Sequence, residues 1–368
     1  MARRPHSNLS TSSRQARTEF TEVVLTPTFK KGKIISLYTF LHYQEFFIKI
    51  MSIKTAEFTS PKHPDKICDF IADSILDAYL EDDKESRVAI EVMGGHKLIT
   101  INGEVTSYAK VDIEKVVSSI VGKNYKIISN IVAQSLEIGR GVDKGGAGDQ
   151  GIMKGYATNE TPEFLPKEYV LARDLCKKIY EVYPYDGKTQ VTMDGLPAQA
   201  GDKVKTVVAS FQNTKNEELL KLVKGFIEAE EYLINPAGEW TSGGFDADTG
   251  LSGRKLVIDN YGPEVPIGGG SFSGKDYTKV DRSGAYMARR IAVELLQKRG
   301  AREVYTKLAY AIGKSEPVMA VAVVDGVEES IIGYDLSPRG IREYLKLDKV
   351  KFADTSTWGH YGRGFEWN

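Results

Sequence analysis

Apolar side chains recur at helical spacing just after Pro64 and predict the first helix of the chain. The positions on this spacing are Ile67, Phe70, Ile71, Ser74, Ile75, Ala78 and Tyr79, and they follow the i, i+3, i+4 pattern of an amphipathic helix. Proline is favoured at the first helical position. The pattern therefore makes His63 the N-cap and puts Asp65 in the first turn.

Similar patterns divide the rest of the chain into strands and helices. Further helices are predicted at 112–121, 166–183, 216–230 and 281–298, with a short one from about Ser337. Strands are predicted at 87–92, 97–101, 188–193, 204–211, 256–260, 304–312 and 318–324. The glycine-dense segments 139–155 and 268–274 are predicted to be irregular. The mixed order, with a Gly94-Gly95 hairpin, indicates an α+β fold, and three strand–helix blocks of similar size suggest a repeated architecture.

The first 50 residues differ from the rest. Residues 1–17 contain four arginines, five serine or threonine residues and no acid, a composition shared with transit peptides. The interpretation we favour is a stretch translated ahead of a start at Met51, because a complete, well-patterned protein begins there. We therefore expect 1–51 to lie outside the fold. Residues 34–50 are apolar but contain Glu45 and Lys49, so we do not expect them to span a membrane.

Composition narrows the class of protein. Among 368 residues, 49 Lys and Arg balance 50 Asp and Glu, for a net charge of -1, which argues against a general nucleic-acid binder. Apolar and charged shares of 41% and 27% are those of a globular protein. Cys68 and Cys176 fit neither a disulfide framework nor a zinc site. We therefore expect a reducing compartment, the cytoplasm.

Two glycine loops are candidates for anion binding. Gly146–Gly151 matches G-x-G-x-x-G, but no strand is predicted before it, as a dinucleotide site requires. Gly269–Lys275 matches G-x-x-x-x-G-K, but Asp276 replaces the Ser or Thr of a P-loop. Backbone N–H groups of such loops can approach an anion closely, with a lysine adding charge. A plain flexible turn remains the alternative.

Charged residues cluster at two predicted helix starts. His63 and Asp65 could supply a hydrogen bond to a substrate and a ligand for a hard cation. Lys275, Lys279 and Asp281 could serve a phosphate and its cation together. For both clusters, an ordinary helix cap remains an open alternative. The residues thus indicate an α+β enzyme suited to a magnesium-bound nucleotide, without identifying the reaction.

Through these motifs the chain resembles the S-adenosylmethionine synthetase family. The matching stretches follow the family's order and cover nearly everything from Ser52 onward; they are 63–66, 146–151, 155–161, 250–255, 268–276, 279–283 and 359–363. The resemblance implies three similar α+β domains of mixed sheet and helix, related by pseudo-threefold symmetry. We expect these domains at 52–145, 146–237 and 238–368, with a gating loop at 134–144 that glycines make physically plausible.

The resemblance also implies a reaction. The sulfur of L-methionine attacks C5′ of ATP to give S-adenosylmethionine, and the departing triphosphate is cleaved to pyrophosphate and phosphate. Two Mg²⁺ and one K⁺ per site are expected, in a homodimer with shared active sites that often pairs into a tetramer, without nucleic-acid or membrane partners. A thioether carries no proton to remove, so no general base is needed. Cations that are already in position can instead stabilise the negative charge that builds on the triphosphate, which lowers the activation barrier.

Roles follow from the resemblance position by position. The expected catalytic residues are His63, Lys188 and Lys275. The expected ATP contacts are His63, Asp186, Lys188, Trp240, Asp248, Arg254, Lys255, Ser271 and Lys275. The expected methionine contacts are Glu104, Gln134, Asp149, Asp248 and Lys279. Asp65 and Asp281 are expected to bind magnesium, and Glu91 is expected to bind potassium.

Two segments depart from the family pattern. Ser60-Pro61-Lys62 stands where Ser-Glu-Gly is usual, and Glu239-Trp240 stands where a basic residue and Phe are usual. Glu239 reverses the charge expected near adenine, whereas Trp240 keeps an aromatic face for stacking. These departures affect the expected nucleotide affinity and oligomer packing more than the reaction.

Two rival hypotheses are weaker. A non-catalytic relative has no chemical reason to keep the three catalytic positions together with Asp65 and Asp281. A different ATP-using transferase should have changed the methionine positions Glu104, Gln134 and Lys279.

Overall fold

The computed structural model describes residues 53–135, 141–142, 145–194 and 203–368. The chain forms two units, Met1–Ile50 and Met51–Asn368, and all described residues belong to the second. The predicted extension and most of the predicted gating loop lie outside the described residues. Within the described ranges, no helix is both long and apolar enough to cross a membrane.

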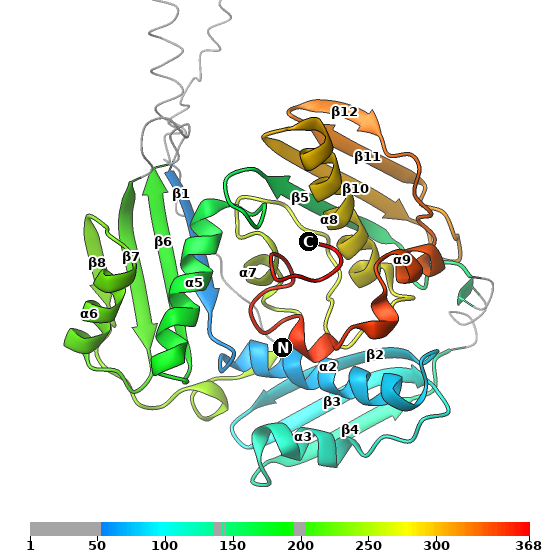
Figure 1. Ribbon diagram of the computed structural model, residues 1–368. Helices are drawn as coiled ribbons and strands as arrows, with labels where there is room; N and C mark the ends of the chain where they lie inside the picture. The colour runs from blue at the N-terminus through cyan, green and yellow to red at the C-terminus, as the bar shows by residue number, and fades with distance from the viewer. Residues whose placement is uncertain (1–52, 136–140, 143–144, 195–202) are drawn as a thin grey trace, which may run out of the picture. The chain divides into compact units, whose positions relative to one another are not determined.

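Three four-stranded sheets, each with helices packed on one face, form the fold (Figure 1). The N-terminal sheet has the order β4 (Lys126–Val132), β3 (Leu98–Thr106), β2 (Arg87–Gly95), β9 (Gly250–Leu251). The central sheet has the order β1 (Ile53–Thr59), β6 (Gly187–Asp194), β7 (Val204–Phe211), β8 (Glu231–Ile234). The C-terminal sheet has the order β12 (Val327–Ser330), β11 (Met319–Val324), β10 (Glu303–Tyr310), β5 (Gly151–Thr158).

Each sheet has its own helices. The N-terminal sheet carries α2 (Pro64–Asp82) and α3 (Ile113–Val121), the central sheet α5 (Lys167–Val182) and α6 (Asn216–Phe226), and the C-terminal sheet α8 (Val280–Arg299) and α9 (Pro338–Tyr344). On β2 the buried residues Val88, Ile90 and Val92 alternate with more exposed ones, so one face packs against α2 and the other stays open. The remaining elements are short: α7 (Leu256–Asn260), η1 (Gly244–Asp246), η2 (Leu347–Lys349) and η3 (Phe352–Asp354).

The chain consists of three consecutive blocks of four strands, β1–β4, β5–β8 and β9–β12, and the first strand of each block belongs to the sheet of another block. The first strand of block one, β1, pairs with β6 of block two, and β5 of block two pairs with β10 of block three. The cycle closes because β9 of block three pairs with β2 of block one. In each block a long helix precedes the second strand, so the blocks repeat one plan, and the predicted three-part α+β fold is confirmed. Because each sheet borrows an edge strand, no continuous segment holds a whole sheet, and the predicted domain boundaries remain a prediction.

The third block differs from the other two in one connection. In the first two blocks a helix joins the last two strands, which pair in parallel. In the third, Asp325-Gly326 joins β11 to β12 directly, with Val324 opposite Val327, and the pair is antiparallel. Both turn residues have positive φ, as a tight two-residue hairpin requires. The C-terminal sheet is therefore antiparallel throughout, whereas the other two sheets are mixed.

Several predicted elements need correction. Residues 256–260 form the short helix α7 instead of a strand, because a five-residue apolar run carries no periodic signal that separates the two. Residues 151–155, predicted to be irregular, belong to β5. Gly155 is required there because a Cβ would lie 2.2 Å from the backbone of Ala288 on α8. Helix α6 ends at Phe226 instead of 230, and Asp281 lies in the first turn of α8, after an N-cap at Lys279.

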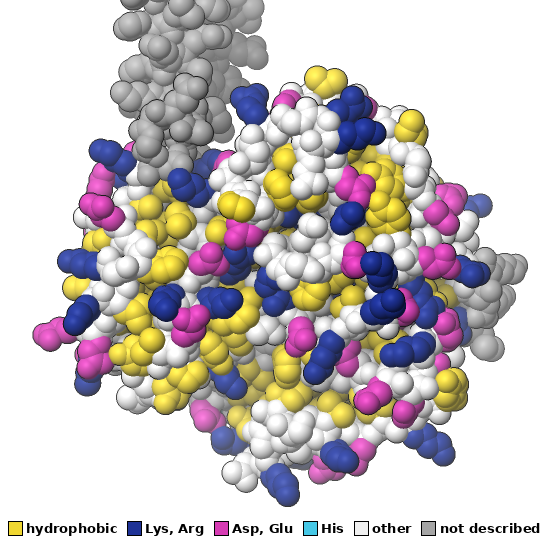
Figure 2. Space-filling view, viewed as in Figure 1, with side chains coloured by type: hydrophobic (Ala, Val, Ile, Leu, Met, Phe, Trp, Pro, Cys, Tyr) yellow, Lys and Arg dark blue, Asp and Glu magenta, His cyan; other side chains and the backbone are white. Residues whose placement is uncertain are grey.

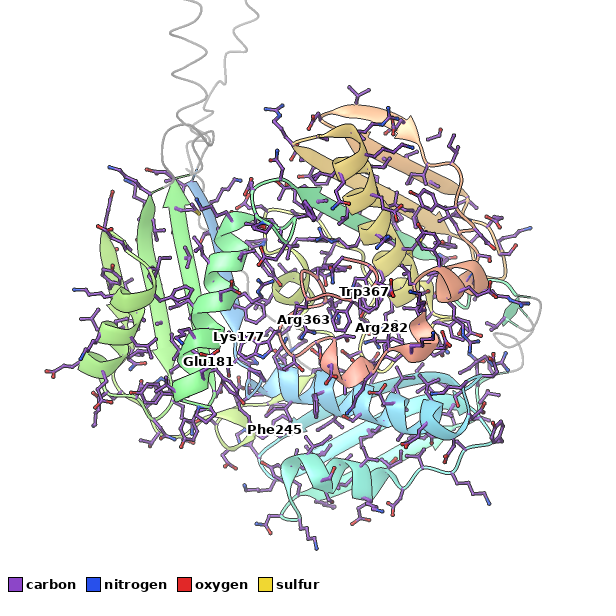
Figure 3. The ribbon with its side chains drawn as sticks, in the orientation of Figure 1. Lys177, Glu181, Phe245, Arg282, Arg363 and Trp367 are labelled. Atoms are coloured by element: carbon purple, nitrogen blue, oxygen red, sulfur yellow. The ribbon has the colours of Figure 1, made fainter. Side chains whose placement is uncertain are left out.

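A buried ion pair fixes α8 to α2 near the centre of the molecule (Figure 3). Arg282 donates to both carboxylate oxygens of Asp73 at 2.6 and 3.0 Å, and neither side chain is exposed by more than 1%. Arg282 also donates to the Thr355 hydroxyl and to the Lys275 carbonyl. The pair therefore joins three segments that are far apart in sequence.

Removal of this arginine should destabilise the fold strongly. In Arg282→Met, the Asp73 carboxylate stays buried without its partner, and we expect the free energy of unfolding to fall by about 3–5 kcal/mol. Urea denaturation followed by circular dichroism measures the change. The control is Arg299→Met, since Arg299 makes an exposed pair with Glu329 and should cost less than about 1 kcal/mol. Equal losses in both variants would contradict this role.

Candidate functional site

Asp65 is the centre of a charged cluster at the N-terminus of α2. Its Oδ1 accepts hydrogen bonds from the Leu251 backbone N–H and the Arg254 Nε, both at 2.9 Å. Its Oδ2 accepts one from the Lys255 Nζ at 2.5 Å. Burial alone would raise the pKa of Asp65, but the bonds from Lys255, Leu251 and Arg254 outweigh it, and the net pKa is lowered. Asp65 is therefore a carboxylate that holds the loop after β9 in place.

His63 presents a neutral imidazole beside these cations. Its Nδ1 accepts the Asp65 backbone N–H at 3.2 Å, which confirms the predicted N-cap. Burial, with the nearby charges of Lys255 and Lys188, lowers the pKa of His63 to about 3. Since Nδ1 accepts, the ring proton must be on Nε2. His63 can thus donate one hydrogen bond to a ligand without carrying a charge.

This protonation state can be tested by NMR. We expect the His63 ring signals, assigned by their loss in His63→Ala, to stay unchanged between about pH 5.5 and 8, where an ordinary histidine titrates. A titration midpoint near 6.5 would contradict the assignment.

The lowered pKa of His63 also affects the stability of the fold. As the pH falls below about 6.5, His63 binds a proton in the unfolded chain but not in the folded protein. The free energy of unfolding therefore falls as the solution becomes more acidic.

The start of β6 adds further predicted nucleotide residues. The Asp186 carboxylate accepts the Gly244 backbone N–H at 2.9 Å, and burial raises its pKa. Lys188 is exposed and lies opposite Ser210 of β7. The Trp240 indole donates to the Ser210 hydroxyl at 3.2 Å, which places the ring beside Lys188. Asp248 is exposed, and its charge acts on both His63 and Asp186.

The second glycine loop continues this cluster. The Glu91 carboxylate accepts hydroxyl hydrogen bonds from Ser252 at 2.6 Å and from Ser271 at 3.3 Å, so it joins the two loops. Lys275 donates to Asp281 at 2.7 Å. A Cβ on Gly270 would lie 2.1 Å from the Asp281 carboxylate carbon, so only glycine allows the loop to approach this acid. The residues around Asp65 and those around Asp281 therefore lie along one continuous surface.

The predicted methionine residues lie in several different surroundings. Glu104 is exposed on the open face of the N-terminal sheet, opposite Ala89, which in turn bridges Lys275. Lys279 is turned inward, where its Nζ donates to the buried Asp276 carboxylate at 2.6 Å. Asp149 is exposed and accepts the backbone N–H of the next residue. Gln134 lies just after β4, and its buried Oε1 has no hydrogen-bond partner in the described part of the chain.

The departure at Glu239 has a local explanation. Its carboxylate accepts hydrogen bonds from the Lys215 Nζ at 2.8 Å and from the Asn216 backbone N–H at 3.0 Å. Asn216 is the first residue of α6, where a carboxylate satisfies a free N–H and the helix dipole favours negative charge. Glu239 therefore caps a helix, and its reversed charge has a structural use.

A row of aspartates on α2 supports the site, and the sequence analysis missed it. Asp65, Asp69, Asp73 and Asp77 are spaced by four residues, and each accepts backbone N–H groups from a later loop. The donors are Leu251 at 2.9 Å, Gly253 at 2.8 Å, Gly274 at 2.8 Å, and Phe352 and Ala353 at 2.8 and 2.9 Å. The detectable signal is an acid at every fourth position of a helix, which places all four on one face. This aspartate row positions both loops that carry the candidate site.

The cluster can bind a polyanion. A neutral N–H donor, two lysines (Lys188 and Lys255) and Arg254 lie around the N-terminus of α2, which is itself favourable for phosphate. Asp65 and Asp281 each hold a lysine, Lys255 and Lys275, whose ammonium occupies the position a metal cation could take. No group of three or more potential metal-ligating side chains occurs among the residues described. Magnesium, however, commonly takes only one or two carboxylates together with phosphate oxygens, so these acids fit that role.

Comparison with known proteins finds one family along the chain. Three family models match consecutive segments, described as the N-terminal domain (51–138), central domain (144–240) and C-terminal domain (242–368) of S-adenosylmethionine synthetase. The S-adenosylmethionine synthase of Mycoplasmopsis pulmonis is 40% identical, with 84% of this chain and 93% of that protein covered. That of Thermus thermophilus is 38% identical, with 87% and 96% covered. A solved S-adenosylmethionine synthetase from Campylobacter jejuni has a TM-score of 0.76 and 32% identity, covering 86% of this chain and 96% of that one.

Proposed function

This chain belongs to the S-adenosylmethionine synthetase family, and from that premise we infer how its site performs the family's reaction. The protein is a methionine adenosyltransferase, which transfers the adenosyl group of ATP to the sulfur of L-methionine and cleaves the triphosphate to pyrophosphate and phosphate. The observation that carries the mechanism is the cluster around His63 and Asp65. There, a neutral donor and several cations surround one helix N-terminus.

The difficult part of the reaction is the departure of the triphosphate. The methionine sulfur is already a nucleophile, so the site needs no base; charge builds on the triphosphate as its bond to C5′ breaks. We propose that the His63 Nε2–H donates to the departing oxygen, because the imidazole is neutral and held in one tautomer. Lys188, Lys255 and Lys275 would stabilise the developing charge. A fixed site of this kind needs no solvent reorganisation during the reaction.

Roles for the remaining residues complete the proposal. The remaining ATP contacts would be Asp186, Trp240, Asp248, Arg254 and Ser271. Methionine would contact Glu104, Gln134, Asp149, Asp248 and Lys279. Since Lys279 now pairs with Asp276, it would need to exchange that partner for the substrate carboxylate. Two buried free cysteines, Cys68 and Cys176, support a cytoplasmic location.

We also propose two Mg²⁺ and one K⁺ per site. Asp65 and Asp281 would hold magnesium, and Glu91, whose oxygens already accept two hydroxyls, would hold potassium. When bound, magnesium would neutralise phosphate oxygens. Lys255 and Lys275, which pair with these carboxylates here, would contact the polyphosphate.

A homodimer with shared sites would cover the open face of the N-terminal sheet. That face carries Glu91 and Glu104 from the proposed site and the exposed apolar side chains Met93, Ile128 and Val132, which are 45%, 44% and 51% exposed. A wide apolar face of this kind is typical of an interface. A second pairing of dimers into a tetramer is the further expectation.

Sedimentation tests the dimer. We expect the wild-type protein to sediment at twice its 40.8 kDa chain mass or more, and Met93→Lys to shift it toward the monomer with a parallel loss of activity. Lys110→Gln, outside this face, should change neither. A wild-type monomer with full activity would contradict shared sites.

The function itself is tested by a direct assay. Purified full-length protein with ATP, L-methionine, Mg²⁺ and K⁺ should produce S-adenosylmethionine, pyrophosphate and phosphate in equal amounts, measured by chromatography. Omission of methionine should abolish the sulfonium product. Failure of a folded protein to form any sulfonium would overturn the proposal.

A further inference from the structure

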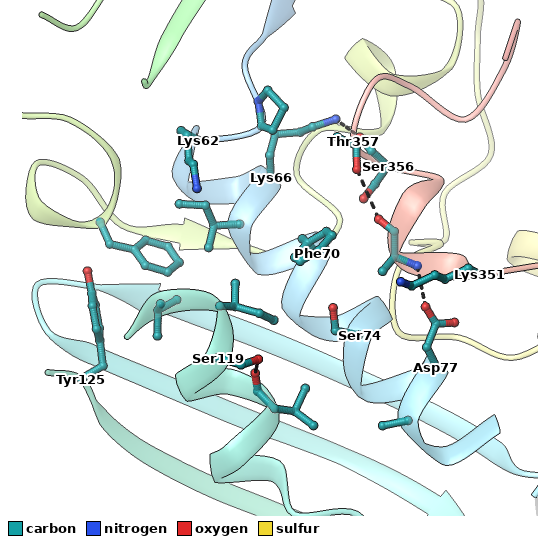
Figure 4. Close-up of a pocket in the computed structure, with 18 of the residues that line it drawn as sticks. Lys62, Lys66, Phe70, Ser74, Asp77, Ser119, Tyr125, Lys351, Ser356 and Thr357 are labelled. Carbon is teal, nitrogen blue, oxygen red and sulfur yellow. Dashed lines mark hydrogen bonds between the residues drawn. The ribbon is translucent and has the colours of Figure 1, made fainter. Parts of the chain in front are cut away.

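A cavity of about 720 Å³ lies beside α2, on the side of the helix that does not face β2 (Figure 4). Its lining comes from α2, α3 and the C-terminal segment 351–357, together with Phe245 and Tyr180. None of the residues of the candidate active site belongs to this lining. The volume lies within the range of about 300–1,000 Å³ that is typical of small-molecule sites.

The sequence of the two helices explains the cavity. On α2, Ile67 and Phe70 are followed at helical spacing by the small residues Ser74 and Ala78. On α3, Ser119 lies among apolar neighbours and faces the same space. Small side chains where two helices face each other leave a hollow with apolar walls. Hydrophobic side chains are visible on this side of the molecule between lysines and acids (Figure 2).

The charged groups of the lining are unequally available. At one end of the cavity, the Asp77 carboxylate already accepts hydrogen bonds from two backbone N–H groups. Lys351 lies close to this carboxylate (Figure 4). The Lys66 Nζ bonds the buried Asp259 carboxylate and the Ser356 carbonyl. Asp77 and Lys66 are therefore satisfied within the protein, whereas Lys351 and the other acid of the lining, Glu81, are exposed.

Lys62 differs from the other cations. It lies at the end of the cavity opposite Asp77 and Lys351 (Figure 4). No side chain among the described residues pairs with its ammonium group, and the lysine is exposed. Lys62 is also part of the Ser60-Pro61-Lys62 segment that departs from the family pattern, and Pro61 lines the cavity beside it. Within the described ranges, a cation without a side-chain partner therefore lies at the mouth of this hollow.

We propose that this cavity binds a small carboxylate with an apolar body, its carboxylate paired with Lys62 and its body against Ile67 and Phe70. The apolar side chains between α2 and α3 favour an apolar body, since polar groups placed against them would be desolvated without partners. The free ammonium favours an anion over a neutral molecule of the same shape. The site is separate from the adenosyl-transfer site and does not depend on the function proposed above.

Calorimetric titration of the full-length protein with decanoate and with 1-decanol tests both parts of the proposal. We expect decanoate to bind at one site per chain, and decanol to bind at least about tenfold more weakly, the equivalent of ~1.4 kcal/mol. A non-hydrolysable ATP analogue should not compete with decanoate. Absence of saturable binding, or competition by the analogue, would overturn the assignment.

Two variants locate the ligand. In Lys62→Gln, decanoate should lose its advantage over decanol, whereas the matched variant Lys351→Gln, at the other end of the cavity, should retain it. In Ser74→Phe, a ring fills the middle of the cavity, so both ligands should stop binding. Circular dichroism and adenosyl transfer report whether that variant is folded, and the lysine pair tests the proposal independently if it is not. Unchanged preference in Lys62→Gln would overturn the ion pair.

Discussion

His63→Ala is expected to reduce kcat by roughly 10²–10³-fold, the usual effect of removing one hydrogen-bond donor to a developing oxyanion. The side chain is held at the α2 N-terminus with Nδ1 accepting the Asp65 N–H, so its Nε2–H is fixed in direction. Because the donated bond should strengthen only as the C5′–oxygen bond breaks, KM for ATP should change little. Steady-state kinetics with varied ATP and methionine measure both constants.

The conservative variant separates chemistry from structure. His63→Asn keeps a polar cap for α2 and should preserve the fold, yet its shorter amide should recover only part of the rate. Circular dichroism should show both variants folded, with a modest loss of stability in the alanine variant because the cap is lost. A kcat within threefold of wild type in folded His63→Ala would contradict the proposed role.

Lys275→Ala is expected to have an effect of similar size, roughly 10²-fold or more on kcat. Its ammonium neutralises Asp281 in this structure, and both groups are mostly buried. Without Lys275, a positive group that we propose to face the triphosphate would be lost from both the bound ATP and the leaving group. KM for ATP should therefore rise as well, which distinguishes this variant from His63→Ala.

The matched control for Lys275→Ala is another lysine of the chain. Lys110→Ala, at an exposed position outside the cluster, should retain full activity. Lys275→Arg keeps the charge but not the compact ammonium, so we expect partial activity. Wild-type rates in folded Lys275→Ala would remove this residue from the catalytic set.

The sequence predicted correctly those parts of the fold that are marked by specific residue types at specific positions. Pro64 and His63 define the start of α2, and the structure confirms both the N-terminal proline and the side-chain cap. The glycine segment 268–274 is irregular as expected, since its backbone must approach Asp281 too closely for any Cβ. The start of α2 depends on neighbours within a few residues, and the irregular loop is marked in the sequence by its many glycines, so both features can be read directly.

The features that the sequence did not predict depend on distant partners. The two-residue strand β9 exists because it meets Met93 and Gly94 of β2, and no local pattern marks so short an edge strand. The direction of Lys279 was also not predictable. From the sequence, Lys279 could pair either with Asp276, three residues away, or with a substrate. In the structure Asp276 is held by the Val88 backbone N–H, and Lys279 donates to it.

The aspartate row has a consequence for how the protein is made. Four acids stacked along one helix face repel one another in isolation, and the groups that relieve this repulsion lie 184 to 276 residues later in the chain. At ribosomal rates, roughly 10 to 40 seconds separate synthesis of Asp65 from that of Leu251. The nascent N-terminal segment must therefore wait, incompletely stabilised, until the last third of the polypeptide emerges. For this architecture, the first helix in the described part of the chain is among the last to be fixed in place.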